Sequence, residues 1–267
     1  MLKRTFSGCN EPVPVGLDTS TGETRFSSVP GDGEGVENED AAGVWELAPD
    51  VIVLALADGM GGGPEGGEAA SLAMDCLDDR LGRWKVGASL RPAILDAFDA
   101  TNDALCAAGK GSGTTLVVVE IDAGRLRTYH AGDSGALVVG QRGRVHHETI
   151  PHSPTGYAVA AGVLEPDEVH DHEDRHYLSN CLGSPELRIE VGPRIELSAR
   201  DTVLLASDGI LDNVRREDRI EAIRKGPLDE AAREVADSAQ AAIEGRGAVV
   251  GHADDATLLL YRPGARA

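Results

Sequence analysis

The sequence has no apolar run long enough to cross a membrane, and we expect no secretory leader. A membrane helix needs about 20 consecutive apolar residues, and the apolar run of residues 51–57 is far shorter. The N-terminus also lacks the basic segment followed by an apolar stretch that marks a secreted chain. We therefore expect a soluble, cytoplasmic protein with no membrane partner.

Basic residues are scarce. The 267 residues include 25 Lys and Arg against 45 Asp and Glu, which gives a formal net charge of −20. Such a charge repels phosphodiester backbones and anionic lipid surfaces. Nucleic acid is therefore excluded as an expected partner.

Cysteine is also scarce, and its spacing carries no metal or disulfide pattern. The four cysteines lie far apart at positions 9, 76, 106 and 181, without a C-x-x-C pair. This excludes a zinc knuckle and a disulfide framework. We expect free, buried thiols.

The residues that are present predict a single domain of 1–267 with an α+β fold. Residues 1–35 are rich in Gly, Pro, Ser and Thr and predict an irregular lead-in with room for one edge strand. Apolar runs predict strands at 51–57, 115–121, 125–130, 136–140, 145–150, 203–206 and 256–261, and another directly after residue 40. Helical periodicity predicts helices over 67–81, 92–105 and 228–243. Residues 151–176 show no period and predict a long surface excursion.

The run VIVLALA ends at Asp58 and opens into a glycine-rich loop. Gly61, Gly63 and Gly66 fit the G-x-G-x-x-G pattern of dinucleotide-binding proteins. The same loop carries three carboxylates, and its proline removes one of the backbone donors that a pyrophosphate needs. There is no G-K-[ST], so a P-loop is excluded.

A second interpretation is that Asp58 is a metal ligand and that the glycine-rich loop gives backbone and solvent access to the bound ion. Four other segments also offer carboxylates at predicted strand ends: NEDA (38–41), GDSG (132–135), ASDGILD (206–212) and HADDAT (252–257). Each alone is more often a turn or cap aspartate. Together they predict one convergent oxygen-ligand site for Mg²⁺ or Mn²⁺.

The ordered motifs resemble those of a known family. They are NEDA, ALADGMGG with GGEAAS, GSGTTLVVV, YHAGDSGALVV, LSNCLGS, DTVLLASDGILDNV and ADDATLLL. In order and spacing, over residues 36–262, this set is similar to the metal-dependent protein phosphatases of the 2C type in their bacterial form. The resemblance implies an αββα sandwich, with two packed, mostly antiparallel β-sheets flanked by helix pairs. It also implies hydrolysis of phosphoserine and phosphothreonine by a metal-bridging hydroxide.

The resemblance also implies a set of site residues. Asp58 is expected to bridge two Mn²⁺ or Mg²⁺ ions, Gly59 to offer its carbonyl, and Asp208 with Asp254 to hold the second ion. Glu39 and Asp40 are expected to act through bound waters. A third ion is implied at Asp133 and Asp212, although a turn-capping role for Asp133 stays open.

The sequence departs from the family pattern at the residue that usually binds the substrate phosphate. The usual arginine is replaced by Gly35, so the group that holds the phosphate is unknown, and Arg25 is one candidate to fold in. Met60 stands where animal members have a histidine. Asp255 stands where Asn is usual, which leaves it a competitor of Asp254 for the metal.

Three functional hypotheses follow. The first is a phosphatase that acts on phosphorylated proteins, the substrates of a cognate Ser/Thr kinase. The second is a catalytically weak phosphoprotein-binding or regulatory module of the same fold, suggested by the missing arginine. A dinucleotide-binding enzyme ranks third.

The histidines outside these motifs have two interpretations. His170, His172 and His176 suggest zinc, but their spacing fits no common zinc pattern, so a solvated loop is favoured. His146, His147 and His152 are interpreted likewise. In the family, residues 151–176 correspond to a variable flap beside the active site.

Overall fold

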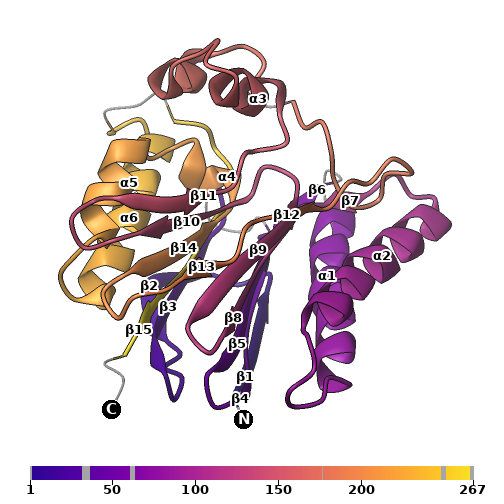
Figure 1. The fold of residues 1–267 in the computed structure, drawn as a ribbon. Helices are drawn as coiled ribbons and strands as arrows, with labels where there is room; N and C mark the ends of the chain where they lie inside the picture. The colour runs from indigo at the N-terminus through magenta and orange to yellow at the C-terminus, as the bar shows by residue number, and fades with distance from the viewer. Residues whose placement is uncertain (1, 32–36, 61–63, 176, 248–250, 265–267) are drawn as a thin grey trace.

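Two β-sheets pack face to face between two layers of helices in the computed structural model (Figure 1). The structure describes residues 2–31, 37–60, 64–175, 177–247 and 251–264. All strand pairs between named strands of the described chain are antiparallel. This is the α+β sandwich that the resemblance predicts, and the prediction is confirmed.

The first sheet runs in the order β1-β4-β5-β8-β9-β12, with β13 also paired to β9. Its strands are β1 (Lys3–Ser7), β4 (Ala41–Ala48), β5 (Val51–Ala57), β8 (Leu116–Asp122), β9 (Arg125–Ala131), β12 (Glu190–Val191) and β13 (Ile195–Glu196). The second sheet runs in the order β11-β10-β14-β15-β3-β2. Its strands are β2 (Glu11–Gly16), β3 (Gly22–Val29), β10 (Gly135–Val139), β11 (Val145–Glu148), β14 (Thr202–Ala206) and β15 (Ala256–Pro263). A small third sheet pairs β6 (Gly59–Met60) with β7 (Gly113–Thr114).

The helices divide between the outer faces of the two sheets (Figure 1). The first sheet is covered by α1 (Pro64–Gly82) and α2 (Arg91–Ala108), and the second by α5 (Arg216–Ile223) and α6 (Leu228–Ile243). A short α4 (Asp208–Leu211) follows β14 directly. The α3 helix (Pro154–Ala160) and the 3₁₀ helix η1 (Pro166–Asp171) stand apart, at one end of the sandwich.

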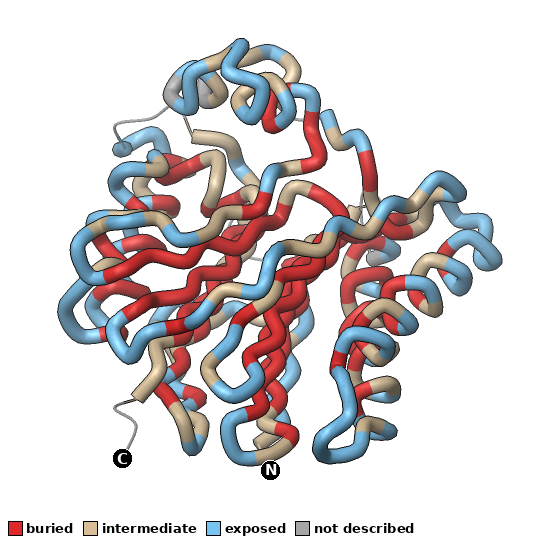
Figure 2. Tube along the Cα trace, in the orientation of Figure 1, coloured by how far each residue is buried: buried red, intermediate tan, exposed pale blue. Residues whose placement is uncertain are grey.

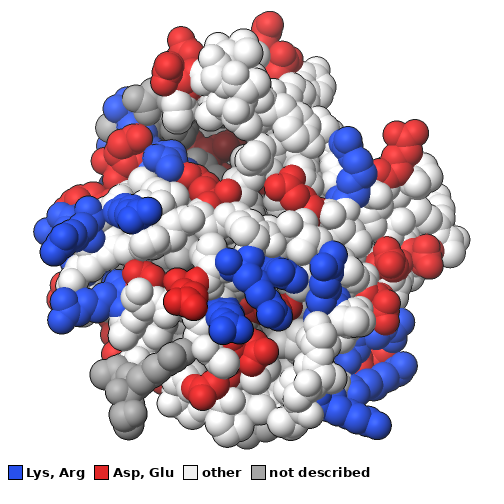
Figure 3. Space-filling view, in the orientation of Figure 1, with Lys and Arg blue, Asp and Glu red and all other residues white. Residues whose placement is uncertain are grey.

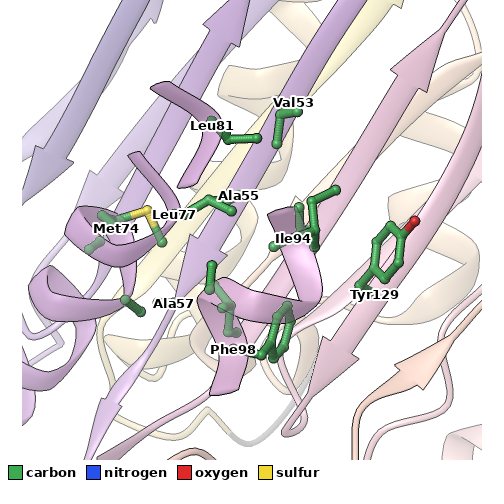
Figure 4. Close-up of a cluster of buried hydrophobic side chains, with 14 of the residues drawn as sticks. Val53, Ala55, Ala57, Met74, Leu77, Leu81, Ile94, Phe98 and Tyr129 are labelled. Atoms are coloured by element: carbon green, nitrogen blue, oxygen red, sulfur yellow. The ribbon is translucent and has the colours of Figure 1, made fainter. Parts of the chain in front are cut away.

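The central strand β5 shows why an uninterrupted apolar run is needed. Its side chains alternate between the two faces of the sheet. Val53, Ala55 and Ala57 pack against α1 and α2 (Figure 4), whereas the alternate residues, Ile52, Leu54 and Leu56, enter the core between the sheets. All seven residues are buried, as the sequence predicts for a strand covered on both faces.

A third core lies between the second sheet and α6. The helix buries one stripe, which includes Leu228, Val235 and Ala239, against β14 and β15. Burial follows the strands and the inner faces of the helices, while the turns at the rim are exposed (Figure 2). The three cores hold the strand ends in fixed relative positions, and the functional residues lie at those ends.

The predicted strands and helices are confirmed, but the N-terminal prediction is wrong. The strand at 51–57 and the helix at 228–243 have the predicted bounds, and the other predicted strands begin and end within two residues of expectation. Residues 1–35 are not an irregular lead-in, because their described part forms β1, β2 and β3. These strands were not predicted because prolines and short polar runs interrupt the segment, as is common in strands at or near a sheet edge.

Two further expectations need correction. The 151–176 stretch contains α3 and η1, which the aperiodic sequence did not predict. The four cysteines are free, as expected, but none is fully buried, and Cys106 is exposed. Within the described part of the chain, no helix combines the length and apolar character needed to cross a membrane.

Candidate metal centre

Aspartates from five separate segments meet at one end of the sandwich. Asp58 ends β5, Asp133 lies in the turn between β9 and β10, and Asp208 begins α4 after β14. Asp40 directly precedes β4, and Asp254 precedes β15. The charge of Asp58 interacts with those of the other four. The structure thus brings together the carboxylates that the strand-end pattern singled out.

Burial and mutual repulsion disfavour the charged forms of these carboxylates. Burial, followed by the neighbouring carboxylates, raises the pKa of Asp58 and of Asp208 well above the ordinary value. Burial likewise raises the pKa of Asp40 well above its ordinary value, that of Asp133 to about 6 and that of Asp212 to about 7. At neutral pH, this many neighbouring buried carboxylates must either bind protons or be neutralised by cations.

Three buried oxygens of this cluster have no hydrogen-bond partner: both carboxylate oxygens of Asp40 and Oδ1 of Asp208. The hydroxyls of Ser207 and Thr257 lie near Asp40 and favour its charged form, but neither makes a hydrogen bond of ordinary geometry to it. Unpartnered buried oxygens are rare because they cost free energy. Carboxylate oxygens left bare in one place fit a hard divalent cation.

Asp58 is held through its backbone. Its amide donates a hydrogen bond to Thr115 Oγ1 at 3.0 Å, and its carbonyl accepts from Thr115 N at 2.8 Å and Thr114 Oγ1 at 2.9 Å. Thr115 Oγ1 also lies 2.7 Å from Ser134 Oγ, next to Asp133. Thr115 of the GSGTT motif thus connects the Asp58 segment to the GDSG segment that carries Asp133. Because Asp58 is held through its backbone, its side chain can face the cluster.

The two neighbouring aspartates before β15 have different partners. Asp255 accepts hydrogen bonds from the amides of Gly31 at 3.0 Å and Glu39 at 2.6 Å, one on each oxygen. Its carboxylate is thereby occupied in joining the NED segment to β15. The charge of Asp254 acts on Asp58, Asp133 and Asp208. The charge of Asp255 also acts on Asp40, so both carboxylates lie near the cluster, but only Asp255 has both oxygens held by backbone amides.

Two asparagines fix the remaining segments. Asn38 accepts from the amide of Asp40 at 2.9 Å and donates to Ser28 Oγ at 2.8 Å. Asn213 bonds the 252 peptide in both directions, donating to the His252 carbonyl and accepting from its amide. Both asparagines belong to motifs that the sequence singled out, NEDA and DGILDN, but their capping roles were not predicted.

Two glycine contacts explain the glycine-rich sequence around Asp58. A Cβ at Gly59 would collide with the carbonyl of Gly66 in α1, and a Cβ at Gly66 would collide with the carboxylate of Glu39. Glycines therefore let the helix start, the β5 end and Glu39 approach closely. Similarly, a Cβ at Gly209 would collide with the Asp255 carbonyl, so this glycine lets α4 approach the Asp254 segment.

The arginine proposed to fold in does not do so. Arg25 donates to both oxygens of Asp229, at 2.6 and 3.1 Å, and to Asp18 at 2.6 Å. Opposite charges on both sides fix it on the outer face of β3. Gly35, and Gly61 and Gly63 of the G-x-G-x-x-G pattern, lie outside the described residues.

His152 is not in a solvated loop, which corrects the interpretation from sequence. It is buried, and its Nδ1 accepts from Gly132 N at 3.1 Å and from Asn180 Nδ2 at 2.8 Å. His147 is partly buried and lies 2.8 Å from Thr128 Oγ1. His146 lies 3.6 Å from Asp201.

The flap histidines give no zinc cluster among the described residues. His172 Nδ1 accepts from the amide of Asp174 at 3.1 Å. His176 and the side chain of His170 lie outside the described residues.

A second group, formed by His130, His152 and Glu190, resembles a metal site, but the hydrogen bonds of His152 place a proton on the nitrogen that a cation would need. One ligand atom each from His130, His152 and Glu190 lie within 4.8 Å of one another. His152 Nδ1 faces two donors, because Asn180 is oriented by its bonds to the Arg188 backbone. Its proton therefore sits on Nε2, which lies 3.4 Å from Glu190 Oε2. A cation at Nε2 would have to displace that proton, so this geometry favours a hydrogen-bonded chain.

The comparison with protein families identifies the chain. The model described as Protein phosphatase 2C matches residues 33–243. This chain belongs to the protein phosphatase 2C family. The match spans β4 to α6 and so includes every cluster aspartate except Asp254.

Curated relatives of this 2C-family chain are bacterial. The serine/threonine protein phosphatase PstP of Mycobacterium tuberculosis is 33% identical over 186 residues, which cover 67% of this chain and 36% of that protein. The serine/threonine phosphatase stp of Listeria welshimeri is 28% identical over 201 residues, covering 70% of this chain and 77% of that protein. Neither name describes a binding module without catalysis.

Solved structures agree with the fold of this 2C-family chain. The M. tuberculosis serine/threonine phosphatase PstP/Ppp superposes with a TM-score of 0.75 at 27% identity, covering 91% of this chain and 99% of that one. A second structure, the PstP catalytic domain in complex with two manganese ions, has a TM-score of 0.70 at 26% identity, covering 91% and 99% of the two chains.

Proposed function

We propose that this chain is a metal-dependent phosphatase that hydrolyses phosphoserine and phosphothreonine in proteins. The observation that carries the proposal is the convergence of five strand-end aspartates with unpartnered buried oxygens. Membership of the 2C family and the phosphatase names of its relatives support the same activity. Phosphorylated proteins, the products of a Ser/Thr kinase, are the proposed substrates.

The carboxylates are proposed to hold two divalent cations, Mn²⁺ or Mg²⁺. The ions would be held by Asp58, the Gly59 carbonyl, Asp208 and Asp254, with Asp40 and Glu39 acting through water. Asp133 and Asp212 are proposed for a third ion. The all-oxygen donor set favours these hard cations, and the two manganese ions in the PstP structure support the number.

Divalent cations at such a site lower the pKa of bound water toward neutrality and screen the charge of a phosphate ester. The chain itself orients the ligands. Thr115, Asn38 and Asn213 fix the backbone of three carboxylate-bearing segments, so little reorganisation is needed when charge develops.

No activated nucleophile of the protein is required. Ser134, the hydroxyl beside Asp133, is hydrogen-bonded to Thr115, and no histidine among the described residues makes a hydrogen bond to it. We therefore assign the chain a role in binding and orienting water and substrate, and not in covalent attack.

The segment 151–176 is proposed to act as a flap of a single domain that spans 1–267. Its α3 and η1 border a cavity whose other wall includes Asp133, Asp208 and Asp212. A substrate protein at the carboxylates would therefore touch this segment.

The test is release of p-nitrophenol from p-nitrophenyl phosphate with and without Mn²⁺. We expect turnover only with metal, and a fall of at least about a hundredfold in Asp58→Asn and in Asp208→Asn, because each change removes a charged ligand. Asp75→Asn is the matched control, since Asp75 is an exposed aspartate of α1 away from the cluster.

Metal-independent turnover, or full activity in both cluster variants, would contradict the proposal. Metal binding with negligible turnover on any phosphopeptide would favour the binding-module hypothesis instead.

A further inference from the structure

A cavity of about 410 Å³ extends from the carboxylates to the flap segment. Asp133, Asp208 and Asp212 form part of one wall, and residues of α3 and η1 form the opposite one. In Figure 3 the surface is hollowed beneath the α3 segment, with acidic side chains visible inside. Its volume lies within the range of about 300–1,000 Å³ that ligand pockets occupy.

Away from the carboxylates the wall is mainly apolar. It includes Leu137, Ile150, Val159, Val169, Leu204 and Leu211. These residues come from both the sandwich and the flap segment, so the apolar surface surrounds the space.

The arginines on this wall already bind protein groups, with Nε of Arg219 left as a donor without a hydrogen-bond partner. Arg216 forms an ion pair with Glu148 at 2.7 Å, and Arg219 Nη1 donates to the Val214 carbonyl at 2.6 Å. Arg175 lies near the carboxylate of Asp212 and interacts with its charge. A charged ligand group deep in this space would lose its hydration with little compensation.

Exposed apolar side chains gather in the flap segment and directly beside its two ends. Six large hydrophobic side chains are exposed among the described residues, and four of them lie between residues 150 and 177: Ile150, Tyr157, Val163 and Tyr177. A concentration of exposed apolar groups beside a cavity marks an interaction surface.

We propose that this cavity binds an apolar side chain of the substrate protein that flanks the phosphorylated residue. The inference rests on the proposed function, because the phosphate must occupy the carboxylate end of the same cavity. Successive residues of an extended peptide are about 3.3 Å apart. A phosphoresidue bound at Asp208, which lines this cavity, therefore brings a neighbouring side chain within reach of the apolar wall.

The first experiment measures kcat/KM of the manganese-loaded full chain on matched phosphothreonine peptides. The peptides differ at one flanking position only, with Leu, Gly or Asp on the N-terminal or C-terminal side. We expect Leu on one side to exceed Gly by at least about tenfold, the lower end of what a hydrophobic pocket discriminates, and Asp to fall below Gly. Equal values for all peptides would overturn the inference.

The second experiment assigns the preference to the cavity. Val159→Asp places a charge on the α3 wall, whereas Val86→Asp does so at a side chain that is 79% exposed, between α1 and α2 and outside the lining. We expect Val159→Asp to remove the Leu preference while p-nitrophenyl phosphate turnover is kept. Val86→Asp is expected to keep both. Val169→Ser, on η1, is a milder second variant with the same expected loss of preference.

The remaining outcomes separate this inference from the proposed function. Retention of the Leu preference in both Val159→Asp and Val169→Ser would overturn the subsite. An equal fall on every substrate, p-nitrophenyl phosphate included, would also overturn it, because the cavity would then only support the carboxylates. Absence of turnover by the wild-type chain on p-nitrophenyl phosphate would overturn the proposed function itself.

Discussion

Adjacent aspartates divide two tasks between them at the start of β15. Both oxygens of Asp255 accept backbone amides, so Asp255→Asn leaves one amide without its acceptor. We expect the free energy of unfolding to fall by about 1 kcal/mol, the lower end of the effect of an unsatisfied donor, because both hydrogen bonds are only partly buried. Urea unfolding of the metal-free protein measures it.

The neighbouring substitution gives the opposite pattern. Asp254→Asn removes a charge that repels Asp58, Asp133 and Asp208, while its own Oδ1 can still accept the Asp255 amide. We expect unchanged or higher stability of the metal-free protein, but at least about tenfold weaker activation by Mn²⁺. If Asp255→Asn abolished metal activation and Asp254→Asn did not, the assignment of the two residues would be wrong.

The buried His130 makes the free energy of unfolding depend on pH. His130 is 1% exposed, and burial lowers its pKa to about 4. Because the unfolded chain binds a proton near pH 6.5 and the folded chain does not, the stabilising effect of neutral His130 is present above pH 6.5. It is lost as the pH falls toward 4.

The measurement compares wild type with His130→Gln, which keeps a donor for the Ile150 carbonyl. The unfolding free energy of the wild type is expected to fall relative to that of the variant by about 3 kcal/mol between pH 6.5 and 4. A difference that stays constant over this window would contradict the neutral, buried state of His130.

At the scale of elements, the start of α1 approaches Glu39 closely at Gly66 but not at the neighbouring Gly67. A Cβ at Gly66 collides with the Glu39 carboxylate, whereas a Cβ at Gly67 meets only atoms 3.7 Å away or more. Gly66→Ala is therefore expected to displace Glu39 and weaken Mn²⁺ binding several-fold in calorimetry. The matched Gly67→Ala keeps metal binding and gains up to about 1 kcal/mol of helix stability. Equal metal affinities in the two variants would contradict the proposed role of Glu39.

Elements with strong periodicity could be predicted from the sequence, and elements fixed by tertiary contacts could not. The buried strand β5 and the amphipathic α6 have continuous or striped apolar patterns, and both were predicted with correct bounds. In contrast, β1 has mostly exposed side chains and α3 is seven residues long, so neither carries a detectable period.

The carboxylates could be predicted because each stands at the end of a recognisable strand, and the groups that hold them could not. Thr115 and Asp255 act through hydrogen bonds to residues far away in the sequence, which no local pattern reports. His152 was misinterpreted for the same reason, since its burial depends on Gly132 and Asn180 from distant segments.

At the scale of the whole molecule, the carboxylate cluster sets how stability depends on pH. The raised pKa values of Asp133, about 6, and Asp212, about 7, mean that the folded chain binds more protons than the unfolded chain above pH 3.8. Their contribution to stability is therefore largest below pH 3.8 and is lost as the pH rises through 6 and 7. Asp58 and Asp208 act in the same direction.

Metal is expected to reverse this trend. For the metal-free protein, Asp133→Asn and Asp212→Asn are expected to stabilise at pH 7.5 relative to wild type, and to do so less at pH 5. Saturating Mn²⁺ is expected to raise the melting temperature more at pH 7.5 than at pH 5, because protons compete with cations for the same oxygens. An equal shift at both pH values would contradict the coupled cluster.

The central claim is that carboxylates from distant parts of the chain meet around divalent cations. Anomalous diffraction from crystals grown with Mn²⁺ tests it most directly. The account predicts two manganese peaks in contact with Asp58, Asp208 and Asp254, and their loss in crystals of Asp58→Asn. Manganese found only at His130, His152 and Glu190, or no manganese near Asp58, would contradict it.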